Sequence, residues 1–311
     1  MTLGDPRGIG PEVVGRAALR FREERPDVEL VVLGARAGLP ENFPLPVEDT
    51  APREGDPMDT DLAAGRASLN AIRQGVELCL QGETDALVTG PVHKPSLHAA
   101  GARFPGQTEL LQALTGVPRT GMLMATEKCR LGGPLRILLA TTHLPLRDVP
   151  ALLTSGLLVD QVLLLDRSLK KGWGLATPRL ALCGLNPHAS DGGLFGDEEA
   201  RILAPAVDRL RGLGVAVEGP FPADTVFLRQ LEGKADAVVV PYHDVGMAVF
   251  KTLSFGEGVN VTLGLPFLRT SPDHGTAFDL VGTGTADASS TLSALRLATR
   301  IGTGNRKAGN I

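Results

Sequence analysis

The sequence predicts an α/β protein with a largely parallel sheet, and three observations lead to this prediction. Short apolar runs recur along the chain, and each is continuous rather than alternating, as in strands that are covered on both faces. Longer segments with apolar residues at helical spacing lie between these runs. The 311 residues are 43% hydrophobic and include 38 glycines, which suits a large core with many tight connections.

Six runs rich in Val, Leu, Ile or Ala are expected to form the strands. In chain order they are Val28–Gly34, Asp85–Thr89, Gly121–Ala125, Leu135–Thr141, Arg179–Cys183 and Ala235–Val240. Because strands that alternate with helices are usually joined by crossover connections, most of the pairing is expected to be parallel.

Five segments are expected to form helices: Pro11–Glu24, Asp61–Gln81, Leu153–Lys171, Asp197–Leu213 and Ala288–Arg300. The first begins with a proline, whose missing N–H is not needed in a first turn, and Glu12 beside it favours the positive end of the helix dipole. The proline-rich stretch Leu39–Pro57 is expected to be a surface loop.

Composition and charge exclude several classes of function. The net charge is -4 and no basic patch is present, which argues against non-specific nucleic-acid binding. The opening MTLGDPRGIG has neither the basic nor the apolar region of a secretion signal, and no apolar run approaches the length of a membrane helix. The three cysteines, Cys79, Cys129 and Cys183, lie far apart and are expected to be buried, reduced thiols. These features predict a soluble cytoplasmic protein that binds neither nucleic acid nor membrane.

Four of the six histidines lie just past the end of a strand candidate: His93, His143, His188 and His243. In open α/β sheets, ligands bind at the carboxyl ends of strands. Three neutral imidazoles can hold a divalent ion and leave a coordination position open for a substrate. A single histidine at a strand end is more often an ordinary hydrogen-bonded residue. The pattern predicts a metal site, and the spacing leaves open which three of the four histidines form it.

Two segments are candidates for binding an anion. Lys251, Asn260 and Arg269 lie in FKTLSFGEGVNVTLGLPFLRTS, and a guanidinium with a nearby lysine suits a phosphate or carboxylate, although solvated surface charges are the commoner explanation. In GQTELL, from Gly106, a threonine lies at an expected helix start, where free N–H groups favour negative charge. The opening GDPRGIGPE is not a G-x-G-x-x-G motif, so it predicts a close-approach loop rather than a Rossmann nucleotide site.

The motifs described above, together with others along the chain, resemble those of the 4-hydroxythreonine-4-phosphate dehydrogenases of vitamin B6 biosynthesis. The shared blocks are GDPRGIGPE, VTGPVHK, GQTELL, TTHLPLRDV, LNPHASDGG, PADTVF, PYHDVG and GVNVTLGLPFLRTSPDHGTAFDLVGTGTAD. GIGPEVV and HGTAFDLVGTGTAD are also similar to isopropylmalate and isocitrate dehydrogenases. The resemblance implies two α/β domains of that type, residues 1–104 with 280–311 and residues 105–279, with the active site in the interdomain cleft. It places the metal ligands and the dimer interface in the second domain.

The resemblance also implies which residues form the site. The metal ligands would be His143, His188 and His243, while His93 is not a ligand in the family. The substrate would be bound by Gln107, Thr108, Lys251, Asn260 and Arg269, with Lys251 also a candidate proton relay. NAD or NADP would lie near His274, Gly275 and Asp287. The divalent ion is expected to be zinc, with cobalt, manganese or magnesium as alternatives, and a homodimer would share its active site between subunits.

The expected reaction oxidises 4-(phosphooxy)-L-threonine at C3, with decarboxylation to 3-amino-2-oxopropyl phosphate. Two departures from the family pattern, Gln107 in place of the usual His and Val245 in place of the usual Gln, keep a related four-carbon acid phosphate, such as 4-phosphothreonate or 4-phosphoerythronate, as the alternative substrate. A metal-dependent hydrolase would use the same histidines without a nucleotide. A non-catalytic binder of phosphorylated ligands would need only the anion-binding residues.

Overall fold

The computed structural model of the chain describes residues 1–52 and 58–307, with side chains as far as residue 302. Two compact units are present: the first comprises Met1–Thr120 and Val259–Thr303, and the second is built from Gly121–Gly258. Residues 105–120 and 259–279, which the resemblance assigned to the second domain, are grouped here with the first unit. The α/β class is the one expected.

The first unit contains two groups of hydrogen-bonded strands. They are β1 (Val32–Gly34), β2 (Val47–Asp49), β3 (Ala86–Val88), β9 (Val259–Leu263) and β10 (Leu268–Pro272). β1 pairs with β2 and β3 with β10 in parallel, whereas β9 and β10 are antiparallel. Thr2 forms a single parallel bridge to Leu33 and another to Thr89, so the opening residues link the two groups.

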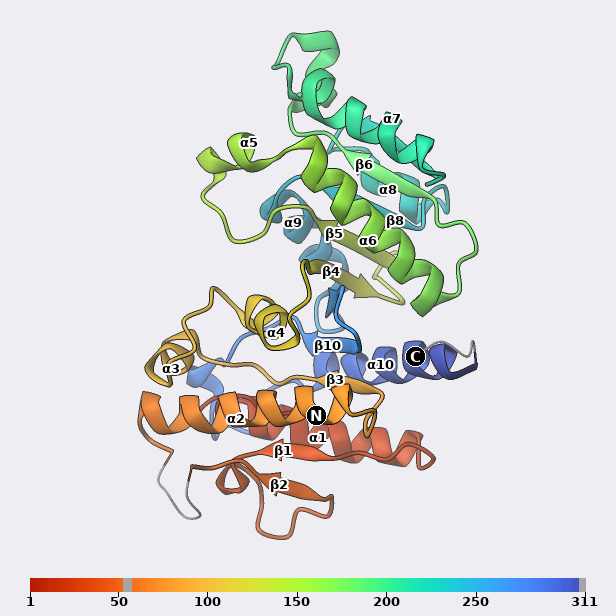
Figure 1. Cartoon of the computed structure of the whole chain (residues 1–311). Helices are drawn as coiled ribbons and strands as arrows, with labels where there is room; N and C mark the ends of the chain where they lie inside the picture. Colours follow the sequence, from red (N-terminus) through yellow and green to blue (C-terminus); the bar gives the residue numbers. More distant parts are fainter. Residues whose placement is uncertain (53–57, 308–311) are drawn as a thin grey trace. The chain divides into compact units, whose positions relative to one another are not determined.

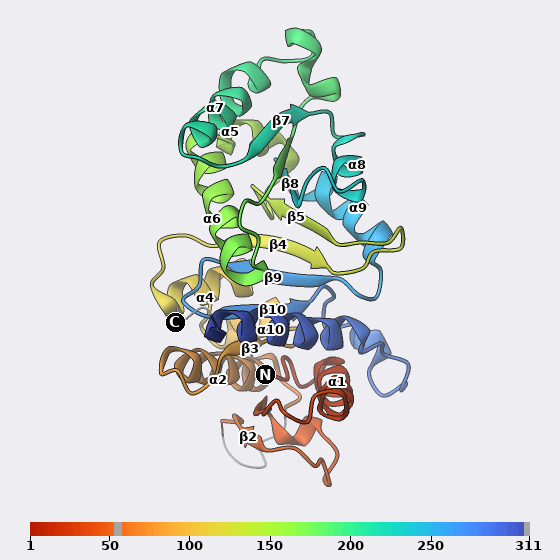
Figure 2. The ribbon, with the colours of Figure 1, turned by 90° about the vertical axis from the view of Figure 1, so that its right-hand side faces the viewer.

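Helices cover both faces of these strands. They are α1 (Gly10–Glu24), α2 (Asp61–Leu80), α3 (Lys94–Ala99), α4 (Gln107–Thr115) and α10 (Ser289–Lys307), with short 3-10 turns at Arg36–Gly38 and Phe278–Leu280. Figures 1 and 2 show α2 on one face and α1 with α10 on the other. Two apolar clusters correspond to these faces, one around Val13 and Val32 and one around Ile72 and Leu87.

The second unit contains a five-stranded sheet in the order β4-β5-β8-β6-β7. Its strands are β4 (Gly121–Thr126), β5 (Leu135–Leu139), β6 (Leu180–Cys183), β7 (Val217–Phe221) and β8 (Ala237–Val240). β4 and β5 are antiparallel, and the remaining neighbours are parallel. Every residue of β5, β6 and β8 is buried, which explains why their sequences are apolar throughout apart from Arg136 in β5.

The helices of the second unit also lie on both faces of its sheet. They are α5 (Val149–Leu152), α6 (Ser155–Trp173), α7 (Ala204–Gly212), α8 (Val226–Leu231) and α9 (His243–Ser254), with a 3-10 turn at Leu146–Asp148, an irregular turn at Pro187–Gly193 and a π-helical turn at Glu199–Leu203. Figures 1 and 2 show α6 and α7 on one face and α8 and α9 on the other.

All six expected strands are present, although the first is only three residues long. Strands β7, β9 and β10 and helices α3, α5, α8 and α9 were not among the expected elements, and three further details differ from expectation. The stretch Leu39–Pro57, expected to be a loop, contains β2, and its residues 53–57 lie outside the described part of the chain. The expected helix Asp197–Leu213 is divided into a π-helical turn and α7. The sheet pairing is mixed, because β4 and β9 each run against a neighbour.

Among the described residues, no single helix is long and apolar enough to cross a membrane. A bent pair, Leu146–Leu152 and Ser155–Trp173, at 91° to each other, reaches the required length and hydropathy only when both members are counted together. The longer member buries its apolar side chains, such as Leu158, Val162 and Leu165, within the second unit.

Helix α6 offers a direct test of how the second unit is stabilised. The Thr154 side chain caps its first turn by accepting a hydrogen bond from the Leu157 N–H at 3.1 Å. We expect Thr154→Ala to lower the free energy of unfolding by about 1 kcal/mol, because the first turn loses that acceptor. The only tryptophan of the chain, Trp173, ends α6, so its fluorescence during urea denaturation reports on this unit.

Thr252→Ala is the matched control for this prediction. The exposed Thr252 hydroxyl donates within helix α9 to the Ala248 carbonyl, and such bonds in a helix interior contribute little to stability. Equal effects of the two substitutions would contradict the capping role.

Candidate active site

Three histidines follow three adjacent parallel strands of the second unit. β8 lies between β5 and β6, and all three run in the same direction, so their carboxyl ends lie at one edge of the sheet. His143 comes four residues after β5, His188 five residues after β6, and His243 is the first residue of α9, after β8. The fourth candidate, His93, follows β3 in the first unit. The topology therefore groups His143, His188 and His243 and separates His93 from them.

Two of these imidazoles already lie close together. The ring centroids of His143 and His243 are 5.6 Å apart. Two imidazoles that share a tetrahedral ion at ordinary Zn–N distances have ring centroids about 5 Å apart. His243 Nδ1 lies 2.8 Å from the Asp244 carboxylate, an arrangement that leaves Nε2 as the ligating atom. The pair therefore fits a divalent metal ion.

The third histidine does not complete a site within one chain. Across residues 1–52 and 58–307, no three His, Cys, Asp or Glu side chains are arranged so that they could hold a metal ion. His188 lies in a turn whose residues 188–192 all have positive φ, between 44° and 75°. Its ring packs edge-on against Phe195, with centroids 6.2 Å apart.

A buried carboxylate fixes the start of the His188 turn. Glu199 Oε1 accepts hydrogen bonds from the backbone N–H groups of Leu185 and Asn186 at 2.8 and 2.7 Å. The Asn186 amide donates to Glu198 and Glu199 at 2.7 and 2.8 Å. No motif in the sequence indicates these residues, apart from the pair of glutamates about ten residues after NPH.

Arg269 is the most buried cation of the first unit's candidate site. Its side chain is only 2% exposed, and its N–H groups donate to the hydroxyls of Thr89 and Thr262. Among the residues that the structure describes, no carboxylate pairs with it. Burial lowers the pKa of Arg269 to about 10, so the guanidinium stays charged at neutral pH. An uncompensated buried cation is suited to bind an anion.

The strand register explains how this cation is held. Arg269 lies opposite Thr262, and Asn260 lies opposite Ser271, so all four side chains project from the same face of the β9–β10 pair. Asn260 Oδ1 is buried, and no hydrogen-bond donor reaches it from the described residues. This face therefore combines a charged donor and an open acceptor.

Gln107 connects Arg269 to the backbone. Its Oε1 accepts from Arg269 Nη2 at 3.2 Å, and its Nε2 donates to the Gly90 carbonyl at 3.2 Å. A neutral imidazole at this position could make the same pair of bonds, since it also offers one acceptor and one donor. Thr108, in the first turn of α4 beside Gln107, is 9% exposed.

The remaining expected residues are placed as follows. Lys251 lies on α9, two turns after His243, and Val245 packs against the apolar cluster of the second unit. Val245 is therefore accounted for by packing. Asp287 accepts a hydrogen bond from the Ser289 N–H at 2.9 Å, and so orders the start of α10.

The segment around His274 suits a ligand that donates hydrogen bonds. His274 Nδ1 lies 3.0 Å from the Gly275 carbonyl, which can only accept, so Nδ1 carries the proton. Nε2 is then an acceptor, and it is buried with no donor in the described structure. A Cβ added to Gly275 would meet no atom within 4 Å, so the backbone here is open to a neighbour. A dinucleotide, rich in hydroxyl and amino donors, fits these features.

Comparisons with known proteins identify the family that this chain matches. Residues 31–298 match the family described as pyridoxal phosphate biosynthetic protein PdxA. The chain is 42% identical over 312 residues to a 4-hydroxythreonine-4-phosphate dehydrogenase of Burkholderia vietnamiensis, covering 96% of this chain and 94% of that protein. It is 43% identical over 314 residues to the protein of the same name from Aromatoleum aromaticum, with the same coverage.

Solved structures show the same relationship. The crystal structure of 4-hydroxythreonine-4-phosphate dehydrogenase from Klebsiella pneumoniae has a TM-score of 0.82 at 37% identity, covering 97% of this chain and 98% of that one. Isocitrate dehydrogenase from Methylococcus capsulatus has a TM-score of 0.53 at 14% identity, covering 99% of this chain and 87% of that one. The second similarity shows a shared fold only.

The buried cation leads to a prediction about stability and anion binding. Arg269→Met should lower the free energy of unfolding by about 1 to 3 kcal/mol, because the buried oxygens of Thr89, Thr262 and Gln107 lose their donor. Inorganic phosphate should raise the melting temperature of the wild type and not that of the variant, since only the wild type binds the anion. Differential scanning calorimetry with and without phosphate measures both effects.

Arg22→Met is the control, because Arg22 is an exposed arginine on α1 whose guanidinium donates to the Pro44 carbonyl. A fall of more than about 3 kcal/mol in the free energy of unfolding of Arg269→Met, with phosphate still raising its melting temperature, would contradict the prediction. The guanidinium would then stabilise the fold without binding the anion.

Proposed function

Because the chain belongs to the PdxA family of pyridoxal phosphate biosynthetic proteins, whose named members are dehydrogenases, we propose that it oxidises 4-(phosphooxy)-L-threonine at C3. The product would be 3-amino-2-oxopropyl phosphate, formed with loss of carbon dioxide and reduction of NAD or NADP. The proposal extends the activity named for the relatives from Burkholderia vietnamiensis and Aromatoleum aromaticum to this chain.

The buried, uncompensated guanidinium of Arg269 is the observation that carries this proposal. A substrate with a phosphate and a carboxylate supplies the anion that the described residues do not. A hydrolase acting on neutral substrates would have no use for such a charge, and burying it without a partner would be unfavourable.

Residues of the first unit would bind and orient the substrate. Arg269 would donate to an anionic group, with Thr108 beside it in the first turn of α4. Gln107 would hold the guanidinium in place through its bond to Nη2. Asn260 Oδ1 would accept a hydrogen bond from the substrate ammonium or hydroxyl, which would satisfy its buried oxygen.

Residues of the second unit would hold the divalent metal ion, which would polarise the substrate hydroxyl and the ketone that it becomes. His143 and His243 would be two of its ligands, supported by the 5.6 Å separation of their rings, and His188 the third. Because these three side chains do not form a metal site in one chain, we propose a homodimer in which a second copy completes the ligand set. Three imidazoles favour zinc, with cobalt, manganese and magnesium as alternatives.

Lys251 would have two roles. An ammonium group on α9 can bind an anionic group of the substrate, and it can return a proton to the product carbon after carbon dioxide leaves. NAD or NADP would lie along the segment of His274 and Gly275, where the open Nε2 acceptor supports the assignment.

The first experiment is a dehydrogenase assay with the metal-loaded protein. Formation of NADH or NADPH from 4-(phosphooxy)-L-threonine is expected, and chelation of the metal by EDTA should abolish it because the histidine ligands would then be empty. Turnover of 4-phosphothreonate or 4-phosphoerythronate in preference would replace the proposed substrate with the related acid phosphates. No turnover of any of the three by metal-loaded protein would refute the proposed function.

Gln107 provides a sharper test of the substrate assignment. Gln107→Leu should lower kcat/KM by about 10- to 100-fold, because the charged guanidinium loses an acceptor. Gln107→His should stay within about threefold of the wild type, because a neutral imidazole can make both of the bonds that Gln107 makes. The two variants are compared by steady-state kinetics on both substrate classes. A change of preferred substrate in Gln107→His would instead make this position a determinant of specificity.

A further inference from the structure

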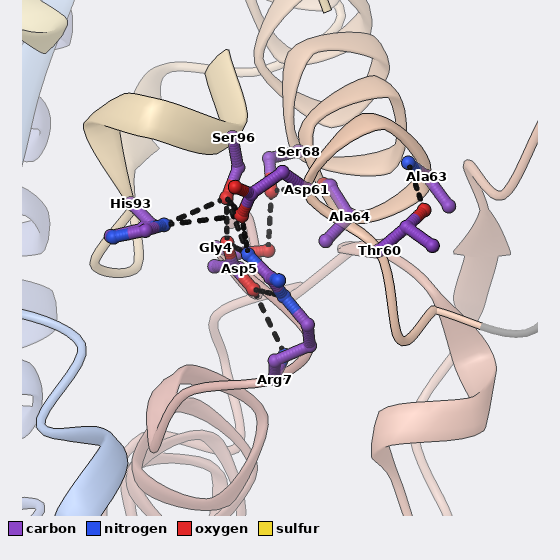
Figure 3. A network of polar contacts seen from close by, with 10 residues as sticks. All are labelled: Gly4, Asp5, Arg7, Thr60, Asp61, Ala63, Ala64, Ser68, His93 and Ser96. Carbon is purple, nitrogen blue, oxygen red and sulfur yellow. Dashed lines mark hydrogen bonds and ion pairs between the residues drawn. The ribbon is translucent and has the colours of Figure 1, made fainter. Parts of the chain in front are cut away.

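Five polar residues of the first unit form a compact network near the start of α1, shown in Figure 3. Asp5 and Arg7 come from the opening loop, Asp61 begins α2, and His93 and Ser96 lie at and just inside the start of α3. The Ser96 hydroxyl is the common partner. It lies 2.6 Å from Arg7 Nη2, 2.8 Å from Asp5 Oδ2, 2.9 Å from His93 Nδ1 and 3.2 Å from Asp61 Oδ1.

Counting protons around Ser96 fixes the tautomer of a neutral His93. The hydroxyl has one proton and two lone pairs. Arg7 can only donate, so it occupies one lone pair. The fully buried Asp5 carboxylate can only accept, so it takes the proton at 2.8 Å. The remaining lone pair must accept from His93 Nδ1, and the Asp61 carboxylate, 3.6 Å from the same nitrogen, favours that proton.

The other ring nitrogen, Nε2, is therefore an unprotonated acceptor. Figure 3 shows the second nitrogen of His93 directed away from the other residues of the network. No hydrogen-bond donor approaches it within the described ranges of the chain. The same state occurs at His274, whose Nε2 is a buried acceptor without a donor. Two imidazoles of the first unit thus each have a ring nitrogen that can accept a hydrogen bond and has no donor in the described structure.

The two imidazoles belong to one region of the first unit. The His93 ring packs edge-on against Phe278, with centroids 4.9 Å apart, and Phe278 comes four residues after His274. The opening loop reaches the same segment, because the Ile9 N–H donates to the Thr276 carbonyl at 2.9 Å. A molecule bound along residues 274–278 would therefore lie beside His93.

The charge of the network indicates what kind of group it accepts. Hydrogen bonding to Asp5 and Asp61 raises the pKa of Arg7, and hydrogen bonding to Arg7 lowers the pKa of Asp61, so these groups remain ionised. Two carboxylates and one guanidinium leave a formal charge of about -1 when the imidazole is neutral. This field disfavours a phosphate at His93 Nε2 and favours a neutral donor, either a hydroxyl or an N–H group.

We propose that this network is part of the dinucleotide site, in which His93 Nε2 accepts a hydrogen bond from a ribose hydroxyl or an amide N–H of NAD or NADP. The proposal rests on the proposed function, because it takes the dinucleotide from the dehydrogenase reaction. Asp5, Arg7, Asp61 and Ser96 are positioning residues that hold the imidazole in the accepting tautomer.

The test separates the two nitrogens of His93. In His93→Asn, the side-chain amide can still donate to Ser96 from the position of Nδ1, but no atom replaces Nε2. The dissociation constants of NADH and of ADP-ribose are measured by titration calorimetry on the metal-loaded protein without substrate. The dissociation constant of NADH should rise about 3- to 10-fold while the melting temperature is kept, as expected for one lost hydrogen bond.

Two further variants keep the test decisive. Ser96→Ala removes the acceptor that fixes the tautomer, so it should raise KM for the dinucleotide and leave kcat near the wild-type value. His98→Asn is the matched control, because His98 lies on the same helix and bonds only the Phe104 carbonyl in the described structure. Its NADH affinity should equal that of the wild type.

The outcomes distinguish this inference from the proposed function. A loss of affinity for both NADH and ADP-ribose places the bond in the adenosine half, and a loss for NADH alone places it in the nicotinamide half. Wild-type affinity of His93→Asn for both ligands would overturn the inference, even if the enzyme turns over its substrate. If the wild type fails to oxidise the phosphorylated acids but binds NADH through His93, the inference stands and the substrate assignment falls.

Discussion

A buried guanidinium without a carboxylate partner is the constraint on which the first unit depends. Arg269 lies in β10, and within the described structure its N–H groups donate to neutral oxygens from three other segments: Thr89 after β3, Thr262 in β9 and Gln107 at the start of α4. Because a buried donor left unpaired is unfavourable, the relative positions of these segments are fixed together. The charge itself remains available to a ligand.

The second unit uses rigid strands in a comparable way. β5, β8 and β6 are fully buried neighbours, and each is followed by a histidine. Packing in the core therefore determines the position at which each histidine-bearing segment leaves the sheet. What differs is the support after the strand. His243 is held by helix α9 and by Asp244, whereas the turn that carries His188 depends on the hydrogen bonds that its backbone N–H groups donate to Glu199. In both units, hydrogen bonds made away from the ligand position decide which atom faces it.

The sequence predicted those parts of the fold that local chemistry determines. Strands such as Ala237–Val240 are apolar on both faces, so their pattern identifies them, and histidines at their carboxyl ends indicate a site. β9 and β10 were missed because Asn260, Thr262 and Arg269 place polar side chains in the strands themselves. The bond between Gln107 and Arg269 joins residues 162 positions apart, and no local pattern reports such a contact. The Asp5–Ser96 network is invisible for the same reason.

The turn that carries His188 limits how this sequence can vary over evolution. Four consecutive residues other than glycine, His188 to Asp191, have left-handed backbone conformations, which β-branched side chains adopt with difficulty. Selection at Ala189 therefore acts on backbone shape rather than on side-chain chemistry, whereas the buried Ser190 hydroxyl also donates to the Gly196 carbonyl. Among neutral variants, glycine, asparagine and aspartate should accumulate here, while valine and isoleucine are excluded even though neither would touch a ligand.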